Sequence, residues 1–132
     1  MKIQITTIIL IISYLTCQDN IGGLPYSIQN NLNISTDRAI MPKINISSLI
    51  EQDKNRPTNA PLRYGYKFNV DFSLNNNGEW IELNNGDRIW RIAIHSKDAY
   101  AISLEYDDFY IPKGGLLYLF DEDQSMIAGG YS

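Results

Sequence analysis

Residues 67–94 read KFNVDFSLNNNGEWIELNNGDRIWRIAI, and this stretch decides the expected fold. Apolar and polar residues alternate over 67–74, which is typical of a strand with one buried face. Clusters of Asn and Gly at 75–78 and 84–87 predict two turns, because these residue types tolerate positive φ. The segments that follow the turns, 79–83 and 88–96, predict two further strands.

The same pattern continues towards the C-terminus. Further strands are expected at 99–107, 116–120 and 125–131, with turns at 112–115 and 121–124. About six short strands predict an all-β fold, an antiparallel β-sandwich of jelly-roll type, over residues 62–132. Such sandwiches usually have about seven or eight strands, so we expect this one to be incomplete at its C-terminus.

The first 18 residues have the features of a secretory signal peptide. Lys2 precedes an apolar run from Ile3 to Leu15, which is shorter than the about 20 residues of a membrane-spanning helix. Cys17 follows Thr16, whereas a lipoprotein cysteine usually follows a small residue such as Gly, Ala or Ser. We therefore expect Cys17 to be removed with the signal, leaving an exported chain without a stable membrane anchor.

Residues 19–61, here called the leader, have no sustained period and are rich in Asn, Ser, Ile and Pro. A short helix is expected near 47–53, with Ser48 as its cap and Glu51 three residues later in capping-box spacing. Residues 55–61, which include Pro57 and Pro61, predict a linker to the sandwich domain.

Composition excludes several classes of function. The formal net charge is -4, which argues against a nucleic-acid binder, because such a protein needs a basic patch for the phosphates. The single cysteine excludes an intrachain disulfide and a multi-thiolate metal site. We assign no catalytic, cofactor-binding or metal-ligating residues, but four groups of residues deserve inspection.

The first group is His95-Ser96-Lys97-Asp98, which contains the residue types of a nucleophilic triad. Successive residues of a strand point to opposite faces, so neighbours do not converge as a triad requires. A partly exposed histidine at the end of a strand is the favoured interpretation.

The second group, Asp121-Glu122-Asp123-Gln124-Ser125, resembles the start of a calcium loop. An EF-hand loop needs Gly at its sixth position and Glu at its twelfth, where this chain has Met126 and Ser132. An acidic hairpin tip in water is the favoured interpretation, with a loose calcium site as the alternative.

The third group is an acidic surface. Residues 67–132 hold 5 basic and 11 acidic side chains, net -6, and include Glu105, Asp107 and Asp108. This excess favours solubility, and it also suits docking onto a basic partner domain.

The fourth group is the aromatic residues, which mostly sit at alternating positions and predict a packed core. Trp80 and Tyr110 fit that pattern least well and are candidates for a sugar-binding platform.

The order of several sequence blocks resembles one family. The blocks are Ile21-Gly22-Gly23-Leu24-Pro25-Tyr26-Ser27, Leu49-Ile50-Glu51-Gln52-Asp53-Lys54, Pro61-Leu62-Arg63-Tyr64-Gly65, Gly78-Glu79-Trp80, Asn84-Asn85-Gly86-Asp87-Arg88-Ile89-Trp90-Arg91, Asp108-Phe109-Tyr110-Ile111-Pro112 and Tyr118-Leu119-Phe120-Asp121-Glu122-Asp123. Together they are similar to the N-terminal region of exported trypsin-like serine peptidase precursors of Bacteroidota, of the lysyl-endopeptidase type.

This resemblance implies a precursor whose catalytic His, Asp and Ser lie in a double barrel beyond Ser132, often followed by a sorting domain for type IX secretion. No catalytic position falls within this chain, and His95 matches no triad motif of the family. The expected function is that of a propeptide or accessory domain, with the downstream protease domain as partner. The alternatives are a carbohydrate- or surface-binding module and an exported structural domain without a ligand.

Overall fold

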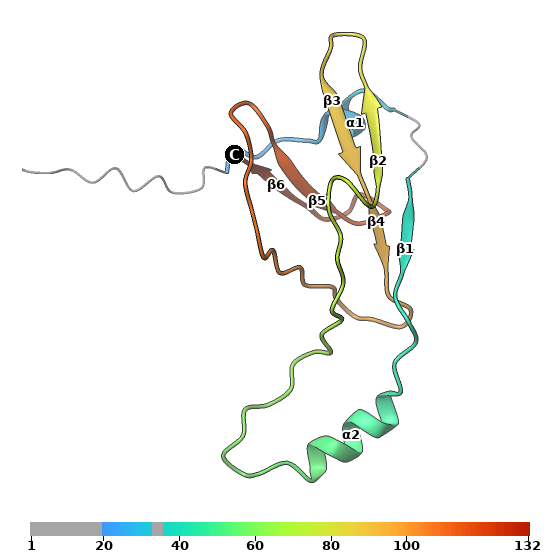
Figure 1. Cartoon of the computed structure of the whole chain (residues 1–132), viewed down its shortest axis with the longest axis vertical. Coiled ribbons are helices and arrows are strands. Elements are labelled where there is room, and N and C mark those ends of the chain that lie inside the picture. The colour runs from blue at the N-terminus through green and yellow to red at the C-terminus, as the bar shows by residue number, and fades with distance from the viewer. Residues whose placement is uncertain (1–19, 33–35) are drawn as a thin grey trace, which may run out of the picture. The chain divides into compact units, whose positions relative to one another are not determined.

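The computed structural model describes residues 20–32 and 36–132 (Figure 1). The predicted signal peptide, residues 1–18 with Cys17, lies outside the described residues. Contacts divide the chain into two compact units. We call residues 20–32 together with 106–132 the terminal unit, and residues 36–105 the central unit.

A β-hairpin organises the central unit. Strands β2 (Glu79–Glu82) and β3 (Arg88–Arg91) pair antiparallel, with Trp80 opposite Trp90 and Ile81 opposite Ile89. Oppositely charged residues face each other at both ends of the ladder, since Glu79 lies opposite Arg91 and Glu82 opposite Arg88. The predicted turn at 84–87 is present and includes Gly86 at φ +87°.

The leader contributes a strand that its sequence did not predict. Strand β1 (Arg38–Ile40) pairs in parallel with β4 (Ala93–His95). The Ala93 N–H donates to Asp37 O at 2.9 Å, and the Met41 N–H donates to His95 O at 2.8 Å. Residues 88–96, expected as one strand, therefore divide at Ile92 into two strands with different partners.

Helix α2 (Ile46–Lys54) occupies the region where a short helix was expected. Its cap is Asn45, whose side chain accepts from the Ser48 N–H at 3.1 Å, so Ser48 is not the cap. Beyond the helix, Arg63 donates to the Asp53 carboxylate at 2.9 Å and to Gln52 Oε1 at 3.2 Å. The chain after the linker thus folds back against the last turn of the helix.

The terminal unit is built on strands β5 (Leu117–Phe120) and β6 (Ile127–Tyr131), which pair antiparallel with an irregularity at Leu117/Tyr118. The start of the leader joins this hairpin, because Ile21 N–H donates to Gly130 O at 3.1 Å. The Tyr118 hydroxyl donates to Gly22 O at 3.0 Å. Helix α1 (Tyr26–Gln29) follows, and its Ser27 is buried.

Two predicted strands are not formed. Residues 67–74 and 99–107 have the expected alternation, but neither pairs with another strand of the described residues. Alternation shows only that a segment suits a half-buried sheet, whereas a strand also needs a partner edge at the correct register. Residues 73–77 form a turn instead, in which Asn76 Oδ1 accepts from the Ser73 N–H at 2.8 Å.

The regular elements of the described residues are therefore mainly β: three two-stranded sheets and two short helices. The predicted packed core is not formed, since no hydrophobic residue in 20–32 or 36–132 is buried. Small sheets of this kind are marginally stable unless another layer covers them.

Candidate functional site

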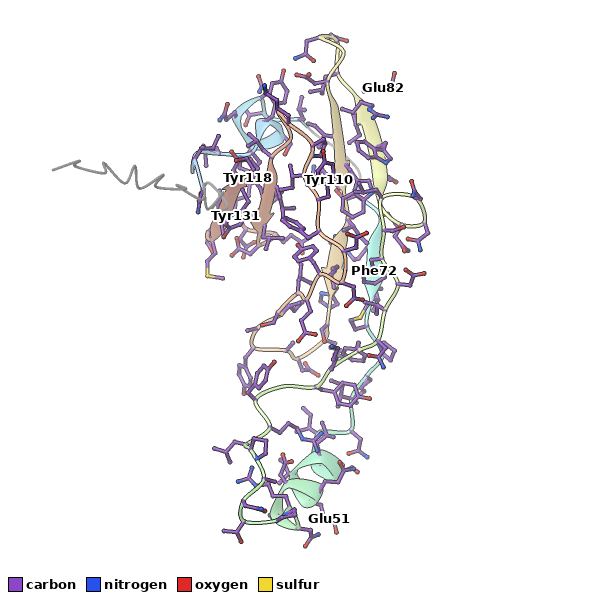
Figure 2. All side chains as sticks on the ribbon, turned by 60° about the vertical axis from the view of Figure 1, so that its left-hand side comes forward. Glu51, Phe72, Glu82, Tyr110, Tyr118 and Tyr131 are labelled. Atoms are coloured by element: carbon purple, nitrogen blue, oxygen red, sulfur yellow. The ribbon has the colours of Figure 1, made fainter. Side chains whose placement is uncertain are left out.

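Uncovered apolar side chains are the main feature of the described surface. The most exposed are Tyr100, Tyr64 at 93%, Tyr110 at 81%, Leu62 and Met126. Tyr110 is labelled in Figure 2. Each of these side chains is left largely uncovered by the described residues, and apolar groups that a chain does not cover itself are candidates for contact with another protein. Tyr110 and Met126 belong to the terminal unit, and Leu62, Tyr64 and Tyr100 to the central unit. We call the exposed large apolar residues of each unit, taken separately, the apolar surface.

Two tryptophans form a local cluster on the β2–β3 hairpin. Trp80 Nε1 donates to Leu74 O and Trp90 Nε1 donates to Asn77 O, both at 2.9 Å. The Arg88 guanidinium lies 4.8 Å from the Trp80 ring centroid, which is cation–π distance. Trp80 is 46% exposed, but its N–H and one ring face are already engaged by the protein itself.

Asp37 links the leader to the β2–β3 region, a role that its place in the sequence does not predict. Its backbone carbonyl accepts from Ala93, and its side chain accepts from the Gly78 N–H at 3.2 Å. The available signal was an Asp directly before a short apolar-containing segment, which is too common a pattern to identify a contact 41 residues away.

His95 lies at the exposed end of β4. The chain then turns, with the Ala99 N–H donating to Ser96 O at 3.3 Å and Asp98 at φ +63°. Among the described hydrogen bonds, none joins His95 to Ser96 or Asp98. The structure therefore does not bring these triad residue types together.

The acidic tip between β5 and β6 is organised by Asp121. Its carboxylate accepts from the Met126 N–H at 2.9 Å and from the Ser125 hydroxyl. These bonds lower the pKa of Asp121, the Met126 bond most and the Ser125 bond next. Both carboxylate oxygens are used within the loop, and the described residues hold no cluster of three or more metal-ligating side chains.

Of the other acidic residues, Glu105 pairs with Lys67, and both side chains of this pair are mainly exposed. Asp107 and Asp108 are exposed as well. Exposed pairs of this kind contribute about 0–1 kcal/mol, so they influence association more than folding.

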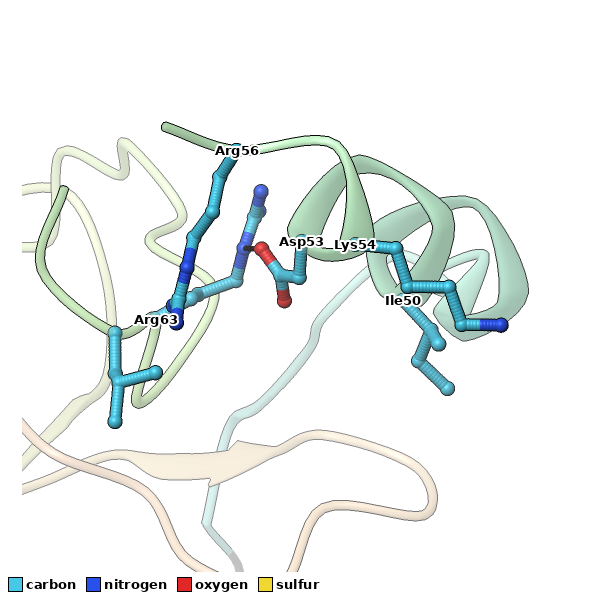
Figure 3. A pocket seen from close by; sticks show the side chains of 6 residues that line it. Ile50, Asp53, Lys54, Arg56 and Arg63 are labelled. Atoms are coloured by element: carbon cyan, nitrogen blue, oxygen red, sulfur yellow. Dashed lines mark hydrogen bonds and ion pairs between the residues drawn. The ribbon is translucent and has the colours of Figure 1, made fainter. Parts of the chain in front are cut away.

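A shallow hollow of about 360 Å³ lies beside helix α2 (Figure 3). Its lining residues are Ile50, Asp53, Lys54, Arg56, Leu62 and Arg63. Figure 3 shows Arg63 directed towards Asp53, so the only carboxylate among these lining residues is already paired. The hollow offers cations and an apolar rim, but no acid–base pair for catalysis.

No family model and no solved structure matches this chain. In the part of the chain that the structure describes, no helix is long and apolar enough to cross a membrane.

Proposed function

We propose that the chain is the N-terminal propeptide or accessory β-module of an exported trypsin-like serine endopeptidase of the lysyl-endopeptidase type. The observation that carries this proposal is the apolar surface, together with the lack of any buried hydrophobic residue in 20–32 and 36–132. Because apolar side chains in water raise the free energy of the chain, a second domain that covers them stabilises it. The proposed cover is the peptidase domain of the same precursor.

Contacts between the blocks that carry the family resemblance support this proposal. Tyr118 bonds to Gly22, which links two of these blocks within the terminal unit. Trp80 lies opposite Trp90, which links two others within the central unit. The resemblance therefore involves residues that hold each unit together.

The charge of the module suits the proposed partner. Residues 67–132 have a net charge of -6, so a basic face on the peptidase domain would be attracted to them. We further propose that packing of the two domains orders the small sheets into a jelly-roll-like sandwich.

The same proposal includes export. The predicted signal, residues 1–18, would be removed with Cys17, and the chain would be secreted, through type IX secretion where the precursor carries a sorting domain. Asn20, which forms a β-bridge with Tyr131, would remain in the mature chain.

Assisted refolding tests the proposed function. The peptidase domain encoded downstream of Ser132 is denatured and then diluted with or without an equal amount of this chain. We expect the chain to raise the yield of active peptidase at least about ten-fold, because a partner that binds the folded domain favours it over the unfolded chain. A reading frame without a peptidase domain, or an equal yield in both samples, would contradict the proposal.

A carbohydrate-binding module is the second candidate, and the exposure of Tyr110 and Trp80 favours it. Tyr110 is the better platform, because Arg88 already covers one face of Trp80. Binding on a glycan array that is lost in Tyr110→Ala, but kept in Tyr64→Ala, a control at a similarly exposed tyrosine, would support this function over the propeptide.

A further inference from the structure

Strands β3 and β4 follow one another along the chain, and β2 and β1 pair with the same edge of this extended segment. In the hairpin, the Leu83 N–H donates to Asp87 O, so odd-numbered residues from 87 onwards direct their backbone groups towards β2. The bonds of Ala93 and His95 to the β1 segment continue this odd-numbered series. Figure 1 shows β2 and β1 one after the other beside this strand.

The other edge carries the even-numbered residues. Successive residues of an extended strand direct their backbone groups to opposite edges. The backbone N–H and C=O groups of Ile92 and Ile94 therefore point away from β1 and β2. No strand of the described residues lies on that side. An open edge of this kind is a template for pairing with a further strand.

The turn after β4 directs the chain towards this open edge. Ser96 is even-numbered, and its carbonyl accepts from the Ala99 N–H across Lys97 and Asp98. Residues 99–105 then follow with a strand-like alternation in which Tyr100, Ile102 and Leu104 are all exposed. A hairpin with this turn would place Ala101 opposite Ile94 and Ile102 opposite Ala93.

We propose that residues 99–105 close onto the edge at Ile92 and Ile94 as a further strand, and that the structure holds the open form of this hairpin. The turn explains the open form. Of its two central residues only Asp98 has positive φ, which is a type II pattern, and type II turns splay the strands of a two-residue hairpin. Closure therefore requires a change of backbone conformation at Lys97 and Asp98, and it covers the open edge of the central unit.

Paired cysteines in the full chain test the register. Both variants carry Cys17→Ser, because Cys17 is the only natural cysteine. Ala93→Cys with Ile102→Cys places two thiols on one face, in a pair without backbone hydrogen bonds, where side chains approach closely. The matched control keeps Ala93→Cys and moves the second cysteine to residue 103 (Ser103→Cys), which faces the other side of the sheet. We expect the first pair to bridge at least about ten-fold faster under mild oxidation, and equal rates would overturn the proposal.

Hydrogen exchange provides a test that does not depend on new cysteines. In the unmodified chain, the amides of Ile92 and Ile94 are expected to exchange more slowly than in Ala101→Pro, which removes an N–H that the closed hairpin needs. Exchange at the same rate in both chains would overturn closure. Neither measurement involves a peptidase, so failure here is distinct from failure of the proposed function.

Discussion

Gly78 permits the close approach of the chain to Arg91 and to the Trp90 ring. Its φ is +72°, and a Cβ added there would lie 2.6 Å from Arg91 O and 2.7 Å from the Trp90 ring. Gly86 has a similar φ of +87°, but nothing lies within 4 Å of an added Cβ. A side chain at residue 86 would therefore meet only an unfavourable φ, whereas one at residue 78 would meet both an unfavourable φ and steric overlap.

We predict that Gly78→Ala destabilises the hairpin by about 3 kcal/mol or more, because it adds overlap to an unfavourable φ. Gly86→Ala is the control and should cost about 1–2 kcal/mol from φ alone. Urea unfolding followed by tryptophan fluorescence measures both, because the two tryptophans of the chain lie in this hairpin. Equal losses in the two variants would contradict this account of Gly78.

At the acidic tip, we predict that Ser125→Ala raises the pKa of Asp121 towards its ordinary value, because it removes one bond to the ionised carboxylate. Since the folded pKa is lowered, the Asp121 contribution to stability is fully present above the unfolded pKa of about 3.9 and is lost as pH falls through the folded value. NMR titration of the Asp121 carboxyl between pH 2 and about 6 measures the shift. Ser47→Ala serves as control and should leave this pKa unchanged.

At the scale of elements, the sequence predicts those elements whose contacts lie close together along the chain. The turn at 84–87 and the flanking strands were predicted, because the turn residues and the paired charges lie close together in sequence. Strand β1 was not, because three residues carry no period and its partner lies 55 positions away, from Arg38 to Ala93. The strands predicted at 67–74 and 99–107 are not formed for the opposite reason, since these segments have the period but no paired edge among the described strands.

Helix α2 gives a prediction at this scale. Asn45→Ala should cost about 1 kcal/mol, because the side chain accepts from the Ser48 N–H. A helix of nine residues is marginal by itself, so circular dichroism should show a loss of helical signal. Ser48→Ala is the discriminating control: it should preserve the helix here, whereas it would weaken a helix that Ser48 capped.

At the scale of the whole molecule, the leader forms backbone pairs within each of the two units. Asn20 and Ile21 bond to β6, while residues 37–41 bond to the β4 segment. A leader that only connected a signal to a domain would make no such bonds. The described contacts therefore require residues from Asn20 onwards to remain attached to the chain.

Truncation tests that requirement. We predict that removal of residues 1–18 preserves the β5–β6 hairpin, because the described contacts begin at Asn20. Removal of residues 1–24 eliminates the bonds from Ile21 to Gly130 and from Tyr118 to Gly22, and should cost about 1–3 kcal/mol. Gly130 lies tightly against this segment, because a Cβ added there would lie 2.5 Å from Gly22 O. Amide exchange of β5 and β6 measures the difference, and equal protection in the two truncated chains would show that the leader contributes nothing to this hairpin.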